Sequence, residues 1–283
     1  VAQTDSDEIA TEGKSCDFLF ADGTGYKRRP DSEKCITNRG ELRVAIGVTD
    51  KGKVVPLGAF SGESWDEIGE KISPKNAYGT SEPISRVLVS DGEEGIATGL
   101  LRLAEDQQRC QWHAGRDARY AMWQDGANRN RQKEMERRLM RIIGIELPEE
   151  DFRKVAPDEK EELQKKMKAA RRELDNFIGE LDEKGYGRTA DYVINASKRL
   201  FTYVQFWLDT GVACPRTSSL IERLMREIGR RLKRIAFGWS EKGAAKMARL
   251  IIKRITSAGE WEEYWKKRLN ISNNVTLIYR GVK

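Results

Sequence analysis

Residues 86–115, RVLVSDGEEGIATGLLRLAEDQQRCQWHAG, constrain the fold of this chain more than any other stretch. An apolar run at residues 87–89 ends at Asp91-Gly92, and a helical pattern follows at Ile96, Leu100, Leu101 and Leu103. A second short run then carries Cys110-x-x-His113. Strand, carboxylate, helix and strand in this order predict an α/β sheet with Asp91 at its carboxyl edge, where open sheets of this class bind ligands.

A second strand-like run supports the interpretation of Asp91 as a site residue. Asp-Gly is also an ordinary turn signal, so Asp91 alone identifies nothing. Residues 17–21, however, form another strand-like run that ends in Asp22-Gly23. The period of two along a strand places Phe18, Phe20 and Asp22 on one face. We therefore expect two strands that each end in an aspartate.

The other elements of the first half are predicted from alternation and turn residues. Residues 41–49 alternate between apolar and other side chains, Asp50-Lys51-Gly52 turns the chain, and residues 54–60 return. This is a hairpin, and with the first strand it makes a three-stranded antiparallel meander. A short helix is expected to begin at Ser64.

Long helices are predicted for the second half. Apolar residues at spacings of three and four indicate helices at residues 131–145, 157–184 and 186–210, and these stripes are interpreted as the core of a helical subdomain. Thr217, Ser218 or Ser219 can cap the next helix, residues 220–235. A last amphipathic helix is expected at residues 240–256, and residues 261–269 and a short apolar tail follow it.

These patterns divide the chain into five parts. Residues 1–15 are a polar linker, and residues 16–127 are the first part of an α/β catalytic domain. Residues 128–215 are an all-helical insertion, residues 216–256 return to the catalytic domain, and residues 257–283 are a C-terminal tail.

The charge distribution favours a polyanionic partner. The net charge of the 283-residue chain is only +6, but Arg and Lys are crowded into residues 122–254. Nucleic acid would explain this, and a solvated helical surface is the alternative. The four cysteines (Cys16, Cys35, Cys110, Cys214) have no framework spacing, which suits a reducing cytosol. No apolar run reaches 18 residues, so we expect a cytoplasmic protein without a membrane partner.

Paired aspartates on a sheet indicate metal-dependent phosphoryl transfer. Mg²⁺ is a hard cation that prefers carboxylate oxygens, and two ions about 4 Å apart stabilise both oxygens of an in-line displacement. Asp22 and Asp91 supply two carboxylates, and a helix packed on the sheet must supply the third. Glu222 and Glu227 on the predicted helix at residues 220–235 are the two choices.

The ordered set of motifs resembles the Mutator-like DDE transposases and their bacterial and archaeal insertion-sequence relatives. FADGTGYKRR holds Asp22, and the hairpin VAIGVTDKGKVVPLGAF and Glu-Ser-Trp at residues 63–65 follow it. VLVSDGEEGI holds Asp91, and Cys110-x-x-His113 comes shortly after. SSLIERLMREIGRR holds Glu222 rather than Glu227 at the position of the family's glutamate. The resemblance covers about residues 16–255.

This resemblance implies a ribonuclease H-like α/β fold, a mixed sheet flanked by helices and interrupted by an all-α insertion domain. It implies that Asp22, Asp91 and Glu222 are catalytic and hold Mg²⁺ or Mn²⁺, with two ions. Water would attack a phosphodiester at the end of a mobile element, and the freed 3′-hydroxyl would attack target DNA. The expected partners are double-stranded DNA, as element ends and target, and a second subunit in a homodimer on DNA. A prokaryotic, nucleoid-associated protein is expected.

Two departures from the family pattern concern the glutamate and the N-terminus. Ser218-Ser219 stand where the family often has an Asn-Asn or Ser-Asn pair. Only a short polar lead precedes Asp22, where family members usually carry a DNA-binding part. Recognition of the element's ends is therefore expected to be missing or supplied elsewhere.

Several residues have both a structural and a functional interpretation. Zinc needs three or four protein ligands and His113 is the chain's only histidine, so we expect Cys110 and His113 to pack or orient rather than bind metal. Trp112 either stacks on a base or is buried. The predicted DNA contacts are Trp112 and His113 together with a row of arginines that would bind phosphates or simply be solvated: Arg223, Arg226 and Arg230.

Two other functions remain open. A ribonuclease H-like nuclease or resolvase would cut DNA without joining it. A DNA-binding protein derived from a transposase would keep the basic helices but not the activity, although the presence of three candidate carboxylates argues against this.

Overall fold

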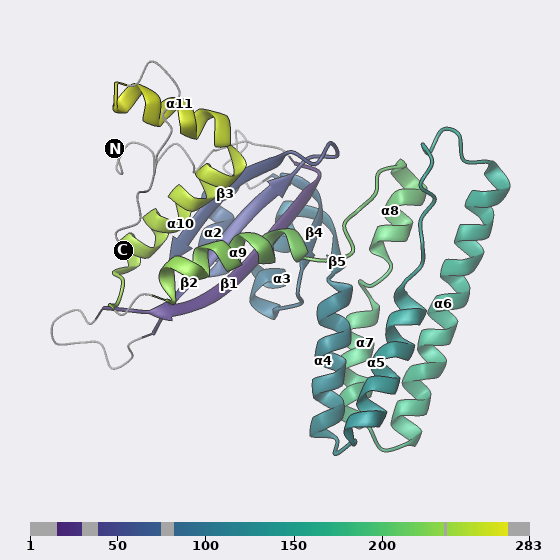
Figure 1. The fold of residues 1–283 in the computed structure, drawn as a ribbon. Helices are drawn as coiled ribbons and strands as arrows, with labels where there is room; N and C mark the ends of the chain where they lie inside the picture. The colour runs from purple at the N-terminus through teal and green to yellow at the C-terminus, as the bar shows by residue number, and fades with distance from the viewer. Residues whose placement is uncertain (1–15, 30–38, 75–81, 235–236, 271–283) are drawn as a thin grey trace, which may run out of the picture.

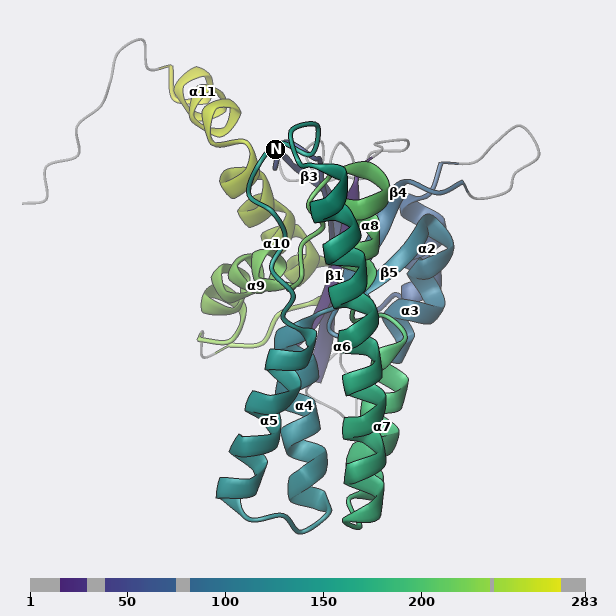
Figure 2. The same ribbon diagram turned by 90° about the vertical axis from the view of Figure 1, so that its right-hand side faces the viewer.

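The computed structural model describes residues 16–29, 39–74, 82–234 and 237–270 (Figure 1). They form a five-stranded mixed sheet with helices on both faces and a unit of long helices beside it (Figures 1 and 2). This confirms the predicted fold class, a ribonuclease H-like α/β sheet interrupted by helices. The predicted linker at residues 1–15, Cys35 and Ile235 lie outside the described residues.

The sheet has the order β3-β2-β1-β4-β5. The strands β1 (Phe18–Lys27), β2 (Arg39–Val48) and β3 (Val54–Ser61) form the predicted antiparallel meander, while β4 (Ser85–Ser90) and β5 (Ala104–Arg109) run parallel to β1. The hairpin turn is closed by a hydrogen bond from the Gly52 N–H to the Thr49 carbonyl, 2.8 Å. Gly52 has a φ of 76°, which glycine adopts without strain.

The prediction that the first strand ends at Asp22 is wrong. Strand β1 continues to Lys27, and Asp22 pairs with Val44 near the middle of the β1–β2 ladder. The glycines after Asp22 suggested a turn, but β2 offers a hydrogen-bonding partner along the whole of β1. Long-range pairing therefore overrides the local turn signal.

Alternate residues of the central strands belong to two separate cores. Leu19 and Leu88 pack under the helices α2 (Trp65–Ile72) and α3 (Glu94–Leu100). The helix α2 lies where it was predicted: it begins at Trp65, and its N-cap residue Ser64 forms a capping box with Glu67. Phe18, Phe20, Val87 and Val89 belong to the other core, which α9 (Ser219–Leu232) and α10 (Glu241–Thr256) cover (Figure 1). A further helix, α11 (Ala258–Arg268), follows α10.

The helical unit comprises α4 (Gln111–Gln124), α5 (Arg129–Ile143), α6 (Pro157–Glu183), α7 (Gly187–Ser197) and α8 (Thr202–Thr210). Helix α4, which the sequence patterns did not predict, packs against α5 and α7 (Figure 1). Helical packing therefore begins directly after Cys110. The inward face of α4 is built mainly of small residues, which give little apolar periodicity: Ala114, Gly115, Ala118 and Ala121.

The single helix predicted for residues 186–210 is wrong, because the chain breaks between α7 and α8. Carbonyl groups at the break accept hydrogen bonds from the edge strand β5: Arg109 N–H donates to Arg199 O at 2.8 Å, and Gln108 Nε2 to Leu200 O at 3.3 Å. The Gln108 side chain also accepts from Tyr203 N–H at 2.8 Å. A continuous helix would have used these backbone groups internally. In the described part of the chain, no helix has the length and apolar character needed to cross a bilayer.

Candidate functional site

Sheet register brings Asp22 and Asp91 together. Phe20 on β1 pairs with Val89 on the parallel strand β4, so two residues further on Asp22 stands level with Asp91. Neighbouring strands lie about 4.8 Å apart. Asp22 and Asp91 each come two residues after Phe20 and Val89, so they lie on the same face of the sheet as these two residues, whose side chains face the core under α9. The predicted common face of Phe18, Phe20 and Asp22 is thus confirmed for the two phenylalanines by their shared core.

The loop after β4 holds Asp91 through a chain of hydrogen bonds. Asp91 Oδ1 accepts from the Glu93 N–H at 2.8 Å, and the Trp65 indole donates to Glu93 Oε1 at 2.9 Å. Gly92 has a φ of 96°, and a Cβ there would lie 2.1 Å from the Arg109 guanidinium carbon. Any other residue at this position would strain the backbone and displace Arg109. The Asp-Gly pair is therefore a structural requirement of the loop as well as the source of a carboxylate.

Cys110 lies at the same level on the next strand. Ser90 pairs with Arg109, so Cys110 stands beside Asp91 one residue past the end of β5. It is fully buried and is the N-cap residue of α4. The Cys110 N–H donates to the Ser90 carbonyl at 2.8 Å, and the Cys110 sulfur accepts from the Ser218 N–H at 3.3 Å. The strands β1, β4 and β5 thus present Asp22, Asp91 and Cys110 in a row.

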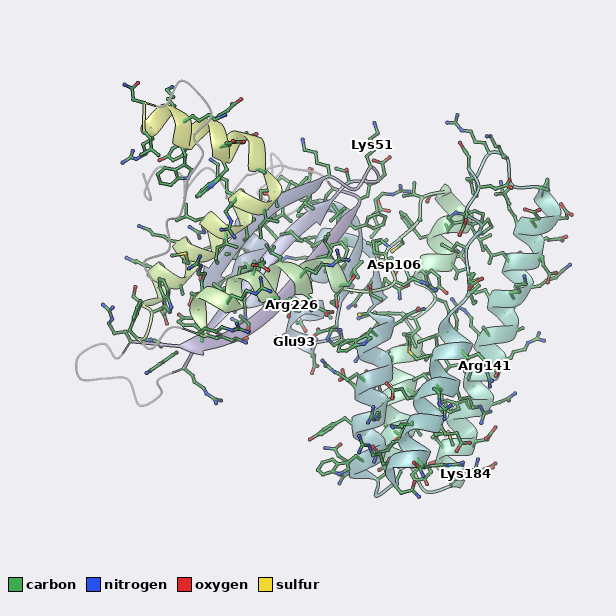
Figure 3. All side chains as sticks on the ribbon, in the orientation of Figure 1. Lys51, Glu93, Asp106, Arg141, Lys184 and Arg226 are labelled. Atoms are coloured by element: carbon green, nitrogen blue, oxygen red, sulfur yellow. The ribbon has the colours of Figure 1, made fainter. Side chains whose placement is uncertain are left out.

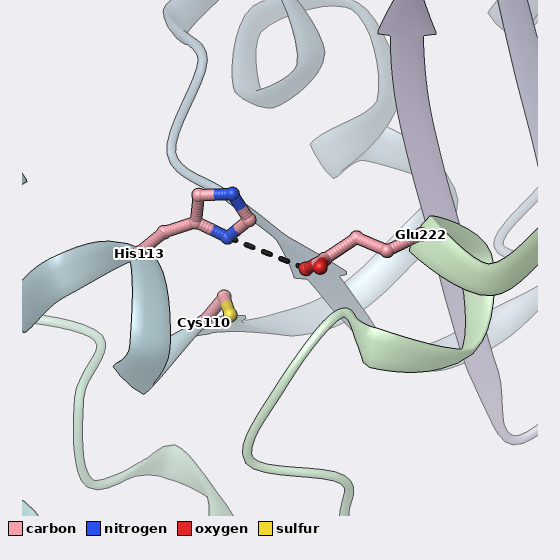
Figure 4. A group of neighbouring side chains, drawn as sticks. All are labelled: Cys110, His113 and Glu222. Atoms are coloured by element: carbon pink, nitrogen blue, oxygen red, sulfur yellow. Dashed lines mark ion pairs between the residues drawn. The ribbon is translucent and has the colours of Figure 1, made fainter. Parts of the chain in front are cut away.

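Glu222 reaches this row from α9, which packs over β1. The Ser218 hydroxyl donates to Glu222 Oε1 at 2.8 Å and lies 3.3 Å from His113 Nδ1. His113 Nδ1 is 3.7 Å from Glu222 Oε1. Figure 4 shows the side chains of Cys110, His113 and Glu222 directed toward one another from the start of α4 and from α9. The structure therefore brings Glu222 to the Cys-x-x-His motif, about 110 residues away in sequence.

Asp22 is in an unfavourable environment for a charge. Burial raises its pKa from 3.8 to about 6, and the negative charges of Asp91 and Glu222 act in the same direction. The Gly23 N–H and His113 oppose this rise. Asp91 and Glu222 therefore both lie close enough to Asp22 to affect its charge.

Cys110 and His113 shift one another's proton affinity. Burial alone would raise the pKa of the Cys110 thiol, but hydrogen bonds with His113 and Ser218 outweigh it and the pKa is lowered. Burial alone would lower the pKa of the His113 imidazole, but the Cys110 sulfur outweighs it and the pKa is raised. The pair therefore favours a thiolate beside an imidazolium.

The carboxylates fit a hard divalent cation by their chemistry. Asp22, Asp91 and Glu222 offer only oxygen, the donor that Mg²⁺ and Mn²⁺ prefer, and a cation would relieve the repulsion that raises the pKa of Asp22. In the described residues, the group of three possible ligands whose ligand atoms all lie within 4.8 Å of one another is Cys110, His113 and Glu222, and not the three carboxylates.

The predicted DNA contact Trp112 is exposed, whereas the predicted contact His113 is buried. Trp112 is 53% exposed, which overturns the alternative that it is buried, and the Arg116 guanidinium lies 5.3 Å from its ring centroid. Tyr120 and Trp123 continue the same exposed stripe along α4. His113 is instead buried at 7% exposure, so its contacts are with the protein.

The predicted arginine row lies on the outer side of α9. Arg223, Arg226 and Arg230 are exposed and line a hollow with an apolar floor, and Figure 3 labels Arg226 on this helix. Glu227 lines the same hollow and forms an ion pair with Arg230 at 2.6 Å. Glu227, the alternative candidate for the third carboxylate, is therefore paired with Arg230, whereas Glu222 faces His113.

Two residues of this region were missed by the sequence interpretation. Ser218 was predicted only as a helix cap, but its hydroxyl makes no capping hydrogen bond and contacts Glu222 and His113 instead. The signal was its position four residues before Glu222, which places both on one helix face. Glu93 carried no signal, because its role depends on the distant Trp65.

Fold and site together define a ribonuclease H-like α/β protein with clustered carboxylates and an adjacent thiol–imidazole pair. No protein-family model matches the chain, and no curated protein is significantly similar to it.

Proposed function

We propose that this protein is a DDE transposase, related to the Mutator-like superfamily, that cleaves DNA at the ends of a mobile element and joins them to target DNA. The observation that carries the proposal is the convergence of Asp22, Asp91 and Glu222. Two carboxylates stand level on adjacent parallel strands, and the third comes from a helix over the same face. The influence of Asp91 and Glu222 on the pKa of Asp22 supports the proximity of the three.

The three carboxylates would hold the divalent ions. Mg²⁺ or Mn²⁺, when bound, stabilises negative charge on the attacking and leaving oxygens of a displacement at phosphorus. The sheet ladder fixes the backbone of Asp22, and the Glu93 N–H holds the Asp91 carboxylate in the loop after β4, so neither has to be ordered when DNA arrives. The Ser218 hydroxyl orients Glu222 by donating to its Oε1.

The surfaces beside the site suit a DNA substrate. The arginines of α9 would bind phosphates without reading sequence, and the exposed stripe of Trp112, Tyr120 and Trp123 offers stacking surfaces for unpaired bases. The helical unit would hold DNA ends or help to pair two subunits into a dimer. Water would act as the first nucleophile and a DNA 3′-hydroxyl as the second, so no protein–DNA covalent bond forms.

Nicking and strand transfer on supercoiled plasmid, with Mg²⁺ or Mn²⁺, test this function. Wild type is expected to give nicked and joined products, and Glu222→Gln is expected to lose both. Glu227→Gln is the matched control on the same helix and should retain activity. Loss in Glu227→Gln alone would show that the third carboxylate is misassigned. Cleavage without joining would replace the transposase by a nuclease or resolvase, and DNA binding without any cleavage would indicate a DNA-binding protein.

A further inference from the structure

A thiol, an imidazole and a carboxylate meet beside the row of aspartates. One ligand atom each of Cys110, His113 and Glu222 lies within 4.8 Å of the other two (Figure 4). The sulfur and the ring come from the end of β5 and the first turn of α4, and the carboxylate comes from α9. The junction of β5 with α4 and the first turn of α9 therefore position the group.

The donor set differs in chemistry from the carboxylate set. Sulfur and imidazole nitrogen prefer a softer cation such as Zn²⁺, whereas Mg²⁺ prefers oxygen. Three protein ligands with an open fourth position form the usual arrangement of a zinc ion that also binds water. The Glu222 side chain keeps 31% of its exposure, which leaves room for water on that side.

The spacing is close to that of a tetrahedral site. Bonds of about 2.3 Å from zinc to sulfur and about 2.1 Å to nitrogen or oxygen place neighbouring ligand atoms roughly 3.3 to 3.6 Å apart. His113 Nδ1 and Glu222 Oε1 are already 3.7 Å apart. The Cys-x-x spacing to His113 across one helical turn brings sulfur and ring to the same side. The Ser218 N–H at 3.3 Å from the Cys110 sulfur adds the outer hydrogen bond that commonly supports a metal-bound thiolate.

We propose that Cys110, His113 and Glu222 form a binding site for a soft divalent cation, Zn²⁺, which shares Glu222 with the carboxylate site. Binding releases to solvent the one proton that Cys110 and His113 hold between them, because the ligands are a thiolate and a neutral imidazole. The expectation that Cys110 and His113 only pack or orient was based on two ligands, and the structure supplies a third. This proposal does not depend on the transposase function, because it concerns binding alone.

Cobalt(II) is the probe, because a thiolate ligand gives it a charge-transfer band in the near ultraviolet and a tetrahedral site gives visible bands. The full chain, freed of metal, is titrated with Co²⁺. One equivalent per chain is expected to produce both features, and one equivalent of Zn²⁺ should remove them. Cys110→Ser should lose the charge-transfer band. Cys214→Ser, another buried cysteine, is the matched control and should keep it.

A second variant keeps the proposal testable if Cys110→Ser fails to fold. His113→Asn should keep the fold by circular dichroism and lower the cobalt affinity at least about 10-fold. The proposal is overturned if wild type shows no charge-transfer band at equimolar Co²⁺. It is equally overturned if the band persists in Cys110→Ser or is lost in Cys214→Ser. None of these outcomes bears on DNA cleavage, so failure of this site and failure of the proposed function are separable.

Discussion

Asp22 combines burial with negative neighbours, and its pKa of about 6 has a consequence for stability. An acid whose pKa is raised on folding holds its proton more tightly in the folded state than in the unfolded chain. Its contribution to stability is therefore lost as pH rises from about 4 to about 6, and above that range the ionised group is a penalty.

Replacing this charge should stabilise the protein. We expect Asp22→Asn to raise the free energy of unfolding by on the order of 1 to 3 kcal/mol near pH 8, with the gain disappearing below about pH 4. Urea unfolding in a chelating buffer at several pH values measures it, and Asp175→Asn on the exposed side of α6 is the control. A gain that does not change with pH would contradict the raised pKa.

Ser218 acts on Glu222 rather than on the backbone of α9. Ser218→Ala removes the donor to Glu222 Oε1 and should lower cleavage roughly 10-fold while raising the Mg²⁺ concentration needed. Cleavage assayed across a range of Mg²⁺ concentrations measures both. Ser219→Ala, one residue further and exposed, should leave both unchanged. Partial rescue by Ser218→Thr would confirm a positioning role, whereas equal loss in Ser219→Ala would indicate a general effect on the helix.

At the scale of elements, the break between α7 and α8 is joined to β5 by side chains of that strand. Gln108 is fully buried and bonds to Leu200 O and Tyr203 N–H. Gln108→Leu would leave the buried Tyr203 N–H without its partner and remove one of the two donors to Leu200 O, the other being Gln111 Nε2. It should cost about 1 to 3 kcal/mol of stability, measured by urea unfolding. Gln124→Leu at the exposed end of α4 should cost little. Similar losses in the two variants would show that the β5 contact contributes nothing specific.

The sequence predicted elements well where the signal was local. Alternation located β2 and β3, and the positions of Asp22 and Asp91 followed from two short apolar runs. It failed where distant contacts decide: β1 extends because β2 pairs with it, and α7 ends because β5 takes the carbonyls at the break. The approach of Glu222 to Cys110 depends on how α9 packs, which no local pattern records.

At the scale of the whole molecule, the two proposed metal sites compete for one side chain. If Zn²⁺ draws Glu222 toward Cys110, stoichiometric zinc should inhibit Mg²⁺-dependent cleavage in wild type. Cys110→Ser should be less sensitive, by at least about 10-fold in the zinc concentration required. Cleavage assays with increasing Zn²⁺ at fixed Mg²⁺ measure this, with Cys214→Ser as control. Equal inhibition of all three proteins would mean that zinc acts elsewhere.

The helical unit leaves and rejoins the sheet at a single point. The Gln111 N–H donates to the Arg216 carbonyl at 2.9 Å, and the Ser218 N–H, two residues after Arg216, donates to the sulfur of Cys110, one residue before Gln111. The roughly 100 residues between these contacts form a segment whose two ends are held together by hydrogen bonds. Most of that segment can lengthen, shorten or be exchanged without moving Glu222 relative to Asp91. Such an architecture lets natural variation change the shape of the helical unit while the chemistry at its base stays constant.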